Sequence, residues 1–539
     1  MTPRLPGLGG FVAAALRRAP SPVIFILAAL LFVPRPASAT ISYRVSLAHG
    51  GQHRIDVQMT IPHPSAGMSV AMPAWNALYQ VRDFSYRIQY VRAFGNGTVN
   101  LGYPVPKSDK QTWRIEYPRL GLSSETRDLF VLYSIEWNDP GPFDTQLNDH
   151  HAFINLAEIL MYVPDRRAED TSVQFGELPA DWNVAAELAR GSAAASFIAP
   201  SYDALVDAPV EAGKFDEFEF DNGGAHFRVV VDAQDWNKRL LGDALSRITA
   251  YELNLMGGPP FDTPRKEYTF FFHIGPYGEV GGGGMEHANS TAIAATSVEN
   301  AASIAAHEFF HAWNVKRIRP QALEPVDYTK EQYTRALWFA EGVTSTYASF
   351  ALERTGLWSK SQFYSDLASE IGRLQSRPAH AWQSVEESSL DAWFEKYDDY
   401  NAPDRSISYY NKGQIVGVLL DLAIRDATDN RKSLDDVMRR MNDEYARQGK
   451  FYGESTGIRA VVEEVAGKSF EEFFRRYVSG TDEIPYNDFL SVAGLELKIE
   501  TAAGAPGMPA AVHASISEIG HASERQRRIR NGLLRGSTD

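Results

Sequence analysis

The chain has 539 residues, a formal net charge of −15 and no cysteine. This length is ample for two large domains, so a hydrophobic core can stabilise the fold without disulfides, and a zinc site with thiolate ligands is excluded. The excess of acidic residues argues against nucleic acid or anionic membranes as partners.

Residues 1–39 have the pattern of a secretory signal peptide. Arg17 and Arg18 precede an apolar run at 23–33, and Ala37-Ser38-Ala39 supplies small residues for cleavage near Ala39. The apolar run is short for a membrane span and no later segment replaces it, so no stable span is expected after cleavage. This pattern predicts a secreted or periplasmic protein, and an uncleaved anchor is the alternative.

Residues 40–207 have the pattern of an N-terminal, mainly antiparallel β domain. Runs of β-branched and aromatic residues at 54–61, 112–117 and 129–135 alternate with Pro and Gly turns. Residues 208–499 form the second predicted domain, in which an amphipathic pattern at 236–256 indicates a helix. Further helical patterns follow, so the expected fold class is α+β.

A glycine cluster at 281–284 follows a predicted strand at 266–275. Without side chains, Gly283 and Gly284 would let an extended peptide pair with the edge of a sheet, which makes both candidates for substrate binding. The alternative is a flexible loop with Glu286 as a surface charge.

The segment His307-Glu-Phe-Phe-His311 has the spacing of a zinc site. On a helix, side chains four residues apart lie on one face, so His307 and His311 can bind the same ion. Glu308 would lie beside the ion as the base that takes a proton from a bound water. The alternative is that His307 and His311 are solvated surface residues. The apolar neighbours Phe309, Phe310 and Trp313 argue against it, because a segment this apolar is mostly buried.

A third ligand is expected downstream. A Met-turn site would need Gly at 314 and His at 317, and the chain has Asn314 and Arg317 there, which excludes that class. Glu341 is the one carboxylate in an apolar run at 337–343, and a buried carboxylate is costly without a cation. Glu341 is therefore the predicted third ligand of one zinc ion per chain. Other downstream acids have polar neighbours, which favours solvated roles for Glu324, Asp327, Glu331 and Glu353.

Two runs, 307–320 and 337–344, resemble the signature of the glycyl aminopeptidase family of zinc peptidases, which are related to alanyl aminopeptidases and thermolysin. The resemblance extends from about 41 to 497. It implies a thermolysin-like catalytic domain, peptide substrates with a free N-terminus, and removal of Gly or Ala residues. Members commonly end in a PDZ domain. Residues 500–539 are too short and too rich in Ala, Gly and Ser for one, and are predicted to be a disordered tail.

The same resemblance implies two more site residues. In alanyl aminopeptidases a Gly-x-Met-Glu-Asn stretch supplies the Glu that binds the substrate ammonium group, and Gly283-Gly-Met-Glu-His287 is similar, with Glu286 in that place. A Tyr-x-Lys-Gly stretch in those enzymes donates a hydrogen bond to the oxyanion. Tyr410, ahead of a predicted helix at 414–428, matches that position, and Tyr409 is the alternative. One run departs from the family, because Trp75-Asn-Ala-Leu-Tyr79 replaces Trp-x-Pro-Gly-x-Tyr.

Together these residues predict a secreted zinc aminopeptidase in which Glu308 is the general base and Tyr410 stabilises the oxyanion. A zinc endopeptidase on the same site is one alternative, which cleavage of N-blocked peptides would favour. A secreted binding protein without catalysis is the other, and the complete set of ligands and base argues against it.

Overall fold

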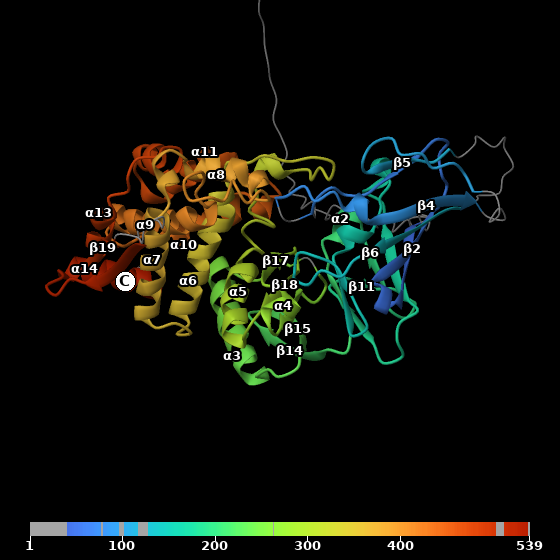
Figure 1. Cartoon of the computed structure of the whole chain (residues 1–539). Helices are drawn as coiled ribbons and strands as arrows, with labels where there is room; N and C mark the ends of the chain where they lie inside the picture. Colours follow the sequence, from blue (N-terminus) through green and yellow to red (C-terminus); the bar gives the residue numbers. More distant parts are fainter. Residues whose placement is uncertain are drawn as a thin grey trace, which may run out of the picture. The chain divides into compact units, whose positions relative to one another are not determined.

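The computed structural model describes residues 40–76, 79–95, 102–116, 128–261, 263–502 and 511–536, so the predicted signal peptide lies outside the described residues. Figure 1 shows the α+β fold that the sequence predicts, with strands concentrated in the N-terminal part of the chain and helices in the C-terminal part. No helix among the described residues is both long and apolar enough to span a bilayer.

The N-terminal domain is built on a seven-stranded sheet with β1 at its centre. β1 pairs antiparallel with β2 and parallel with β9, which is the one parallel pair among the described strands of this sheet. Side chains along β2 alternate between buried and half-buried because one face packs on the domain core. In sheet order the strands are β11 (Ala189–Arg190), β12 (Ser196–Ala199), β9 (Thr171–Gly176), β1 (Ile41–His49), β2 (Arg54–Ile61), β6 (Leu129–Glu136) and β4 (Ile88–Gly95).

A four-stranded sheet completes this domain and extends it beyond the predicted boundary at 207. β13 pairs antiparallel with β8 and with β10, and its residues Val210 and Ala212 are fully buried, so the N-terminal domain continues to Gly213. In order the strands are β10 (Asn183–Ala186), β13 (Val210–Gly213), β8 (His151–Ile154) and β7 (Gln146–Leu147), and a small separate pair is formed by β3 (Ser69–Ala71) and β5 (Thr112–Arg114).

The second domain begins with a five-stranded sheet. Its strands β15, β16 and β18 run parallel, and β17 lies antiparallel at one edge next to β18. Helices α3 (Lys238–Met256) and α5 (Val298–Phe310) pack beside this sheet, as Figure 1 shows. In order the strands are β14 (Asp216–Asn222), β15 (Ala225–Ala233), β16 (Glu267–Ile274), β18 (Ser290–Ala295) and β17 (Gly283–Glu286).

Helices form the rest of the second domain. Helix α9 begins at Tyr409, five residues before the predicted start at 414, because the Ser408 hydroxyl accepts a hydrogen bond from the Asn411 backbone and caps the helix there. Helix α9 runs over Tyr409–Thr428, and the helices that pack around it include α6 (Thr344–Arg354), α7 (Lys360–Gln375), α8 (Val385–Leu390), α10 (Leu434–Glu444), α11 (Glu454–Ala466) and α13 (Tyr486–Leu490).

The C-terminal segment differs from the disordered tail that its composition predicts. Strand β20 (Ala511–Glu518) pairs with β19 (Leu495–Ala502), and helix α14 (Glu524–Arg535) follows. Ile529 and Leu533, four residues apart on one face of α14, are fully buried. The helix is therefore amphipathic although its sequence is rich in arginine. Arg354 of α6 also donates a hydrogen bond to the Leu533 carbonyl. The prediction of disorder is therefore wrong for these residues.

Candidate metal and active site

Helix α5 brings the two histidines of the predicted zinc site together. Ser297 caps its start by accepting a hydrogen bond from the Asn300 backbone, and His311 at the other end keeps helical backbone angles. His307 and His311 therefore stay on one helical face, with their Nε2 atoms 3.0 Å apart.

Glu341 reaches the same point from a π-helical turn, η5 (Trp338–Val343), which leads into α6. Its Oε2 lies 3.2 Å from His311 Nε2 and 3.5 Å from His307 Nε2. Ligand atoms bound to one tetrahedral ion at roughly 2.0 to 2.1 Å lie about 3.3 Å from one another. Two imidazole nitrogens and one carboxylate oxygen with this spacing fit zinc, and π-helical turns are frequent at functional sites.

Neighbouring groups orient both imidazoles toward Glu341. His311 Nδ1 donates to the Asn314 carbonyl at 2.6 Å. His307 Nδ1 lies 3.3 Å from the Ser345 hydroxyl, which donates to the Glu341 carbonyl at 3.1 Å and so accepts from the histidine. Each ring thus keeps its Nε2 lone pair for a metal, the arrangement that outer partners give to metal-binding histidines.

Electrostatics in this site favour a cation. Burial opposes the charged form of His311, but nearby carboxylates, Glu341 first, outweigh it and raise the His311 pKa to about 10. Burial also opposes the Glu341 carboxylate, yet the two imidazoles hold its pKa well below the usual range. The buried carboxylates thus attract positive charge to the point where the three ligand atoms meet.

Glu308 lies beside this point and has one free carboxylate oxygen. Its side chain is buried, and Oε2 has no hydrogen-bond partner among the described residues. Burial raises the pKa of Glu308 well above its usual value. Gly284 of β17 lies directly against it, because a Cβ built on Gly284 would overlap the Glu308 carboxyl group. Gly283 has a φ of +110° and lies against the Phe143 ring.

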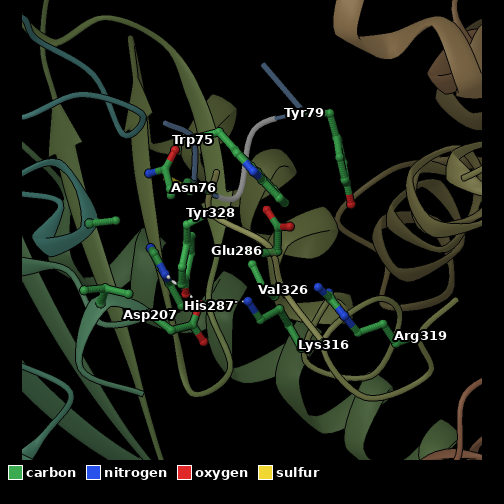
Figure 2. A pocket seen from close by; sticks show the side chains of 13 residues that line it. Trp75, Asn76, Tyr79, Asp207, Glu286, His287, Lys316, Arg319, Val326 and Tyr328 are labelled. Carbon is green, nitrogen blue, oxygen red and sulfur yellow. Dashed lines mark hydrogen bonds and ion pairs between the residues drawn. The ribbon is translucent and has the colours of Figure 1, made fainter. Parts of the chain in front are cut away.

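Glu286 ends β17 within reach of the same centre. One of its carboxylate oxygens, one from Glu308 and one nitrogen of His311 all lie within 4.8 Å of one another. Burial raises the Glu286 pKa, which His311 opposes. Glu286 also lines a small cavity of about 80 Å³. Figure 2 shows its carboxylate below the side chains of Trp75 and Tyr79, which line the same cavity.

A cavity of about 320 Å³, the active-site cavity, is lined by His307, His311, the three glutamates Glu286, Glu308 and Glu341, and both candidate tyrosines. The Tyr410 ring is 38% exposed and its centre lies 6.1 Å from the His307 ring. Tyr409 is buried and donates to Glu395 at 3.5 Å. Both tyrosines line the cavity, and Tyr410 is the more exposed of the two.

Other lining residues carry no sequence signal. Phe143 and Gln80 come from the N-terminal domain and Glu395 from a loop before α9, and all three line the active-site cavity. Tyr79, from the run that departs from the family pattern, also lines it. Ala77 and Leu78, which stand in place of the Pro-Gly turn, lie outside the described residues.

A contact between two glycines holds the tyrosines near Glu341. A Cβ on Gly342 would overlap Gly413 and lie 2.7 Å from the Tyr409 carbonyl oxygen, and a Cβ on Gly413 would lie 2.5 Å from the Trp338 carbonyl oxygen. The absence of both side chains lets the backbones of η5 and α9 touch. This contact sets the first turn of α9, which carries Tyr409 and Tyr410, against the ligand turn.

Comparisons with known proteins point to peptidases. A Peptidase M61 N-terminal domain model matches residues 42–214, and an M61 glycyl aminopeptidase model matches residues 300–416. The crystal structure of an aminopeptidase N family protein from Idiomarina loihiensis is 26% identical, with a TM-score of 0.79, over 86% of this chain and 80% of its own. An M1 zinc metallopeptidase from Deinococcus radiodurans shares the fold at 17% identity and a TM-score of 0.50, over 83% of this chain and 95% of its own. None of the curated proteins matches the chain.

Proposed function

Because the chain belongs to the M61 glycyl aminopeptidase family, we propose that it releases single residues, preferably Gly or Ala, from the free N-terminus of peptides. Membership makes it a metallopeptidase of the aminopeptidase type. The main support for zinc-dependent cleavage at this site is that His307, His311 and Glu341 converge on a cavity that is also lined by Glu308, whose Oε2 atom has no hydrogen-bond partner among the described residues.

The proposed chemistry follows from what surrounds that point. Zinc, one ion at this site, would acidify a bound water and polarise the scissile carbonyl. Glu308 accepts the proton of the water and later passes it to the leaving amine. The Tyr410 hydroxyl donates a hydrogen bond to the oxygen that becomes negative, a contribution on the order of 3 kcal/mol to transition-state stabilisation.

Glu286 is the residue that would restrict cleavage to the N-terminal end of a peptide. A carboxylate at the end of the cavity would bind the substrate ammonium group through a charge-assisted hydrogen bond. A peptide held in this way presents its first peptide bond to the metal, while Gly283 and Gly284 leave the edge of β17 open to the peptide backbone. The small cavity beside Glu286, about 80 Å³, supports a preference for Gly or Ala as the first residue.

The N-terminal sequence pattern supports export, with cleavage near Ala39 giving a secreted or periplasmic enzyme. Mass spectrometry of the protein from the culture medium or periplasm checks this proposal. A mature chain that begins close to Thr40 is expected, and a full-length chain retained in the membrane would contradict it.

The function is tested with Gly-, Ala- and Leu-p-nitroanilide, each with a free and an acetylated amine, after zinc loading. Fast release from the free Gly and Ala reporters, with little from their acetylated forms, is expected. Internal cleavage of acetylated peptides would identify an endopeptidase on the same site. A zinc-loaded protein that hydrolyses none of these substrates would support a binding protein.

A further inference from the structure

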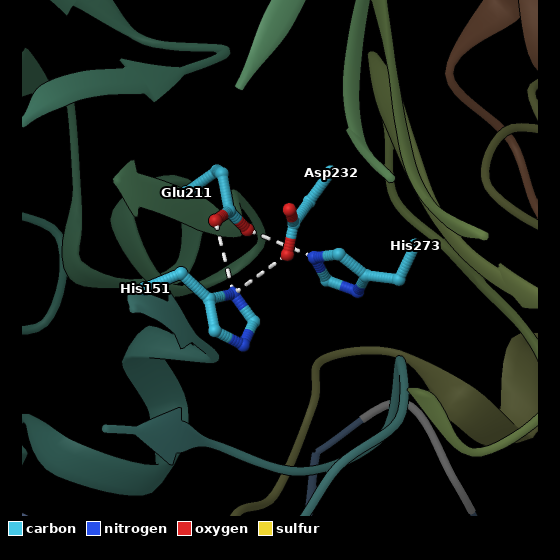
Figure 3. Close-up of side chains that lie close together, drawn as sticks. All are labelled: His151, Glu211, Asp232 and His273. Carbon is cyan, nitrogen blue, oxygen red and sulfur yellow. Dashed lines mark hydrogen bonds and ion pairs between the residues drawn. The ribbon is translucent and has the colours of Figure 1, made fainter. Parts of the chain in front are cut away.

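A second cluster of metal-ligand residues lies away from the peptidase site, where the two domains meet. His151 of β8 and Glu211 of β13 come from the N-terminal domain, and Asp232 of β15 and His273 of β16 come from the sheet of the second domain. One ligand-type atom of each lies within 4.8 Å of all the others. Figure 3 shows the two imidazoles and two carboxylates facing one another.

Three distances within this cluster are similar to those of the catalytic one. His151 Nδ1 lies 3.2 Å from Glu211 Oε1 and 3.4 Å from Asp232 Oδ2. His273 Nε2 lies 2.9 Å from the other oxygen of Glu211. These distances span the value of about 3.3 Å expected between the ligands of one tetrahedral ion.

A hydrogen bond outside the cluster fixes the orientation of His151. Its Nε2 lies 3.1 Å from Gln146 Oε1, an atom that can only accept, so Nε2 carries a proton. In the neutral ring, Nδ1 then has a lone pair turned toward two carboxylates. That arrangement is repulsive unless a cation lies between them, either a second proton on the ring or a metal ion.

Burial makes the need for a cation stronger. Glu211 is 1% exposed and His273 is 5% exposed. One divalent ion balances the charge of the two carboxylates while both imidazoles stay neutral, whereas without a metal this balance would need an added proton on each of His151 and His273.

The cluster is accessible to an ion from solution. It borders a cavity of about 870 Å³, and His151, Asp232 and His273 all line that cavity. Asp232, with 37% of its side chain exposed, stands on the open side. An ion can therefore reach the buried Glu211 carboxylate without separating the domains.

We propose that His151, Glu211, Asp232 and His273 bind a second divalent transition-metal ion, for which zinc is the best fit. Two imidazole nitrogens and two carboxylate oxygens suit zinc more than calcium or magnesium, which prefer oxygen ligands. Four protein ligands leave no position for a substrate, so the role is structural. The ion links two strands of each domain and is additional to the catalytic zinc.

The test counts metal ions in the full chain. Metal-free protein is titrated with zinc chloride by calorimetry, and bound zinc is measured by mass spectrometry after gel filtration. The wild-type protein should bind two equivalents. The double variant His151→Gln/His273→Gln should bind one, keep its kcat on a Gly reporter, and lose part of the thermal stabilisation that zinc gives to the wild type.

A matched control is present in the same cavity. His150 lines it but does not belong to the cluster, so His150→Gln should still bind two equivalents. If the double variant does not fold, Asp232→Asn at the more exposed ligand should weaken the second equivalent alone. In the converse variant, His307→Gln/His311→Gln, one equivalent should remain although peptidase activity is lost.

Three results would overturn the proposal. They are a wild-type protein that binds a single equivalent, a His151→Gln/His273→Gln variant that still binds two, and a His307→Gln/His311→Gln variant that binds none. Hydrolysis of the Gly reporter by the same zinc-loaded samples tests the peptidase function separately, so failure of the second metal site can be told apart from failure of the proposed function.

Discussion

Gly284 on the edge strand β17 lies so close to Glu308 on helix α5 that any side chain at position 284 would overlap the Glu308 carboxyl group. The position of the candidate base therefore depends on a residue that performs no chemistry. Gly284 has ordinary backbone angles, so alanine there would meet a steric obstacle and no backbone strain.

The first prediction is that Gly284→Ala displaces Glu308 and lowers kcat by about 100-fold or more, while zinc is retained, since misplacing a general base removes its contribution. Steady-state kinetics with a zinc assay on the same sample measure this. Gly278→Ala is the control, because a Cβ at Gly278 meets nothing within 4 Å. Equal activity in both variants would show that Glu308 can move without consequence.

Removal of the base itself is the second prediction. Glu308→Gln has nearly the same shape but cannot accept a proton from water, so kcat should fall by about 100-fold to 10,000-fold. Zinc content should stay at the wild-type value, because Glu308 is not among the three proposed ligands. A variant with near-normal turnover would assign the base to another residue.

The third prediction concerns Glu286 and the substrate amine. Loss of a charge-assisted hydrogen bond costs about 1.5 to 3 kcal/mol, so Glu286→Gln should lower kcat/KM on free-amine reporters by about 10-fold to 100-fold. Residual hydrolysis of acetylated reporters should not change. An equal fall on both substrate types would mean that Glu286 acts on the metal site and not on the amine.

The fourth prediction tests the contact between η5 and α9. Gly342→Ala forces the two backbones apart, and overpacking of this kind costs about 1 to 3 kcal/mol in the free energy of unfolding. Because α9 carries Tyr410, kcat should fall as well. Thermal unfolding and kinetics check both effects against Gly520→Ala, where a Cβ meets nothing within 4 Å. A stable and fully active Gly342→Ala protein would contradict the close packing.

The fifth prediction is a pH dependence of stability. Glu158 in the N-terminal domain is fully buried, and burial raises its pKa from 4.5 to about 8 although Arg82 opposes the shift. The folded state therefore keeps a proton that the unfolded state releases. This contribution to stability is complete below about pH 4.5 and is lost as the pH rises to about 8.

Glu158→Gln stays neutral at every pH, so its free energy of unfolding relative to the wild type should increase between pH 5 and pH 8. Urea denaturation at the two pH values measures this difference. Glu116→Gln, at an exposed position in the same domain, should show no such change. A constant difference for Glu158→Gln would mean that Arg82 keeps the carboxylate ionised in the folded protein.

Local sequence patterns predicted the parts of the site that lie close together in the chain. The spacing of His307 and His311 requires only one helical turn to bring their rings together, and the isolated carboxylate of Glu341 stands out in an apolar run. The approach of Gly284 to Glu308 and the contributions of Phe143 and Glu395 to the cavity arise from tertiary packing, which leaves no periodic signal.

The same limit explains the second cluster and the C-terminal helix. His151, Glu211, Asp232 and His273 are scattered along the chain on four strands of two sheets, and they come together only because β8 pairs with β13, β15 pairs with β16, and the two sheets meet. In α14 the arginines dominated the composition, although two apolar residues at helical spacing were enough to bury one face. The amino-acid composition of a segment therefore does not show whether its apolar residues lie on one face that packs against the rest of the protein.

Helix α14 has a practical consequence for recombinant work on this chain. Ile529 and Leu533 cover apolar surface of the peptidase domain, and the Leu533 carbonyl accepts from the buried guanidinium of Arg354. Truncation after β20 would expose that surface and leave Arg354 with fewer acceptors, which favours aggregation. Trimmed expression clones should therefore retain the whole helix, with any affinity tag fused beyond Gly536.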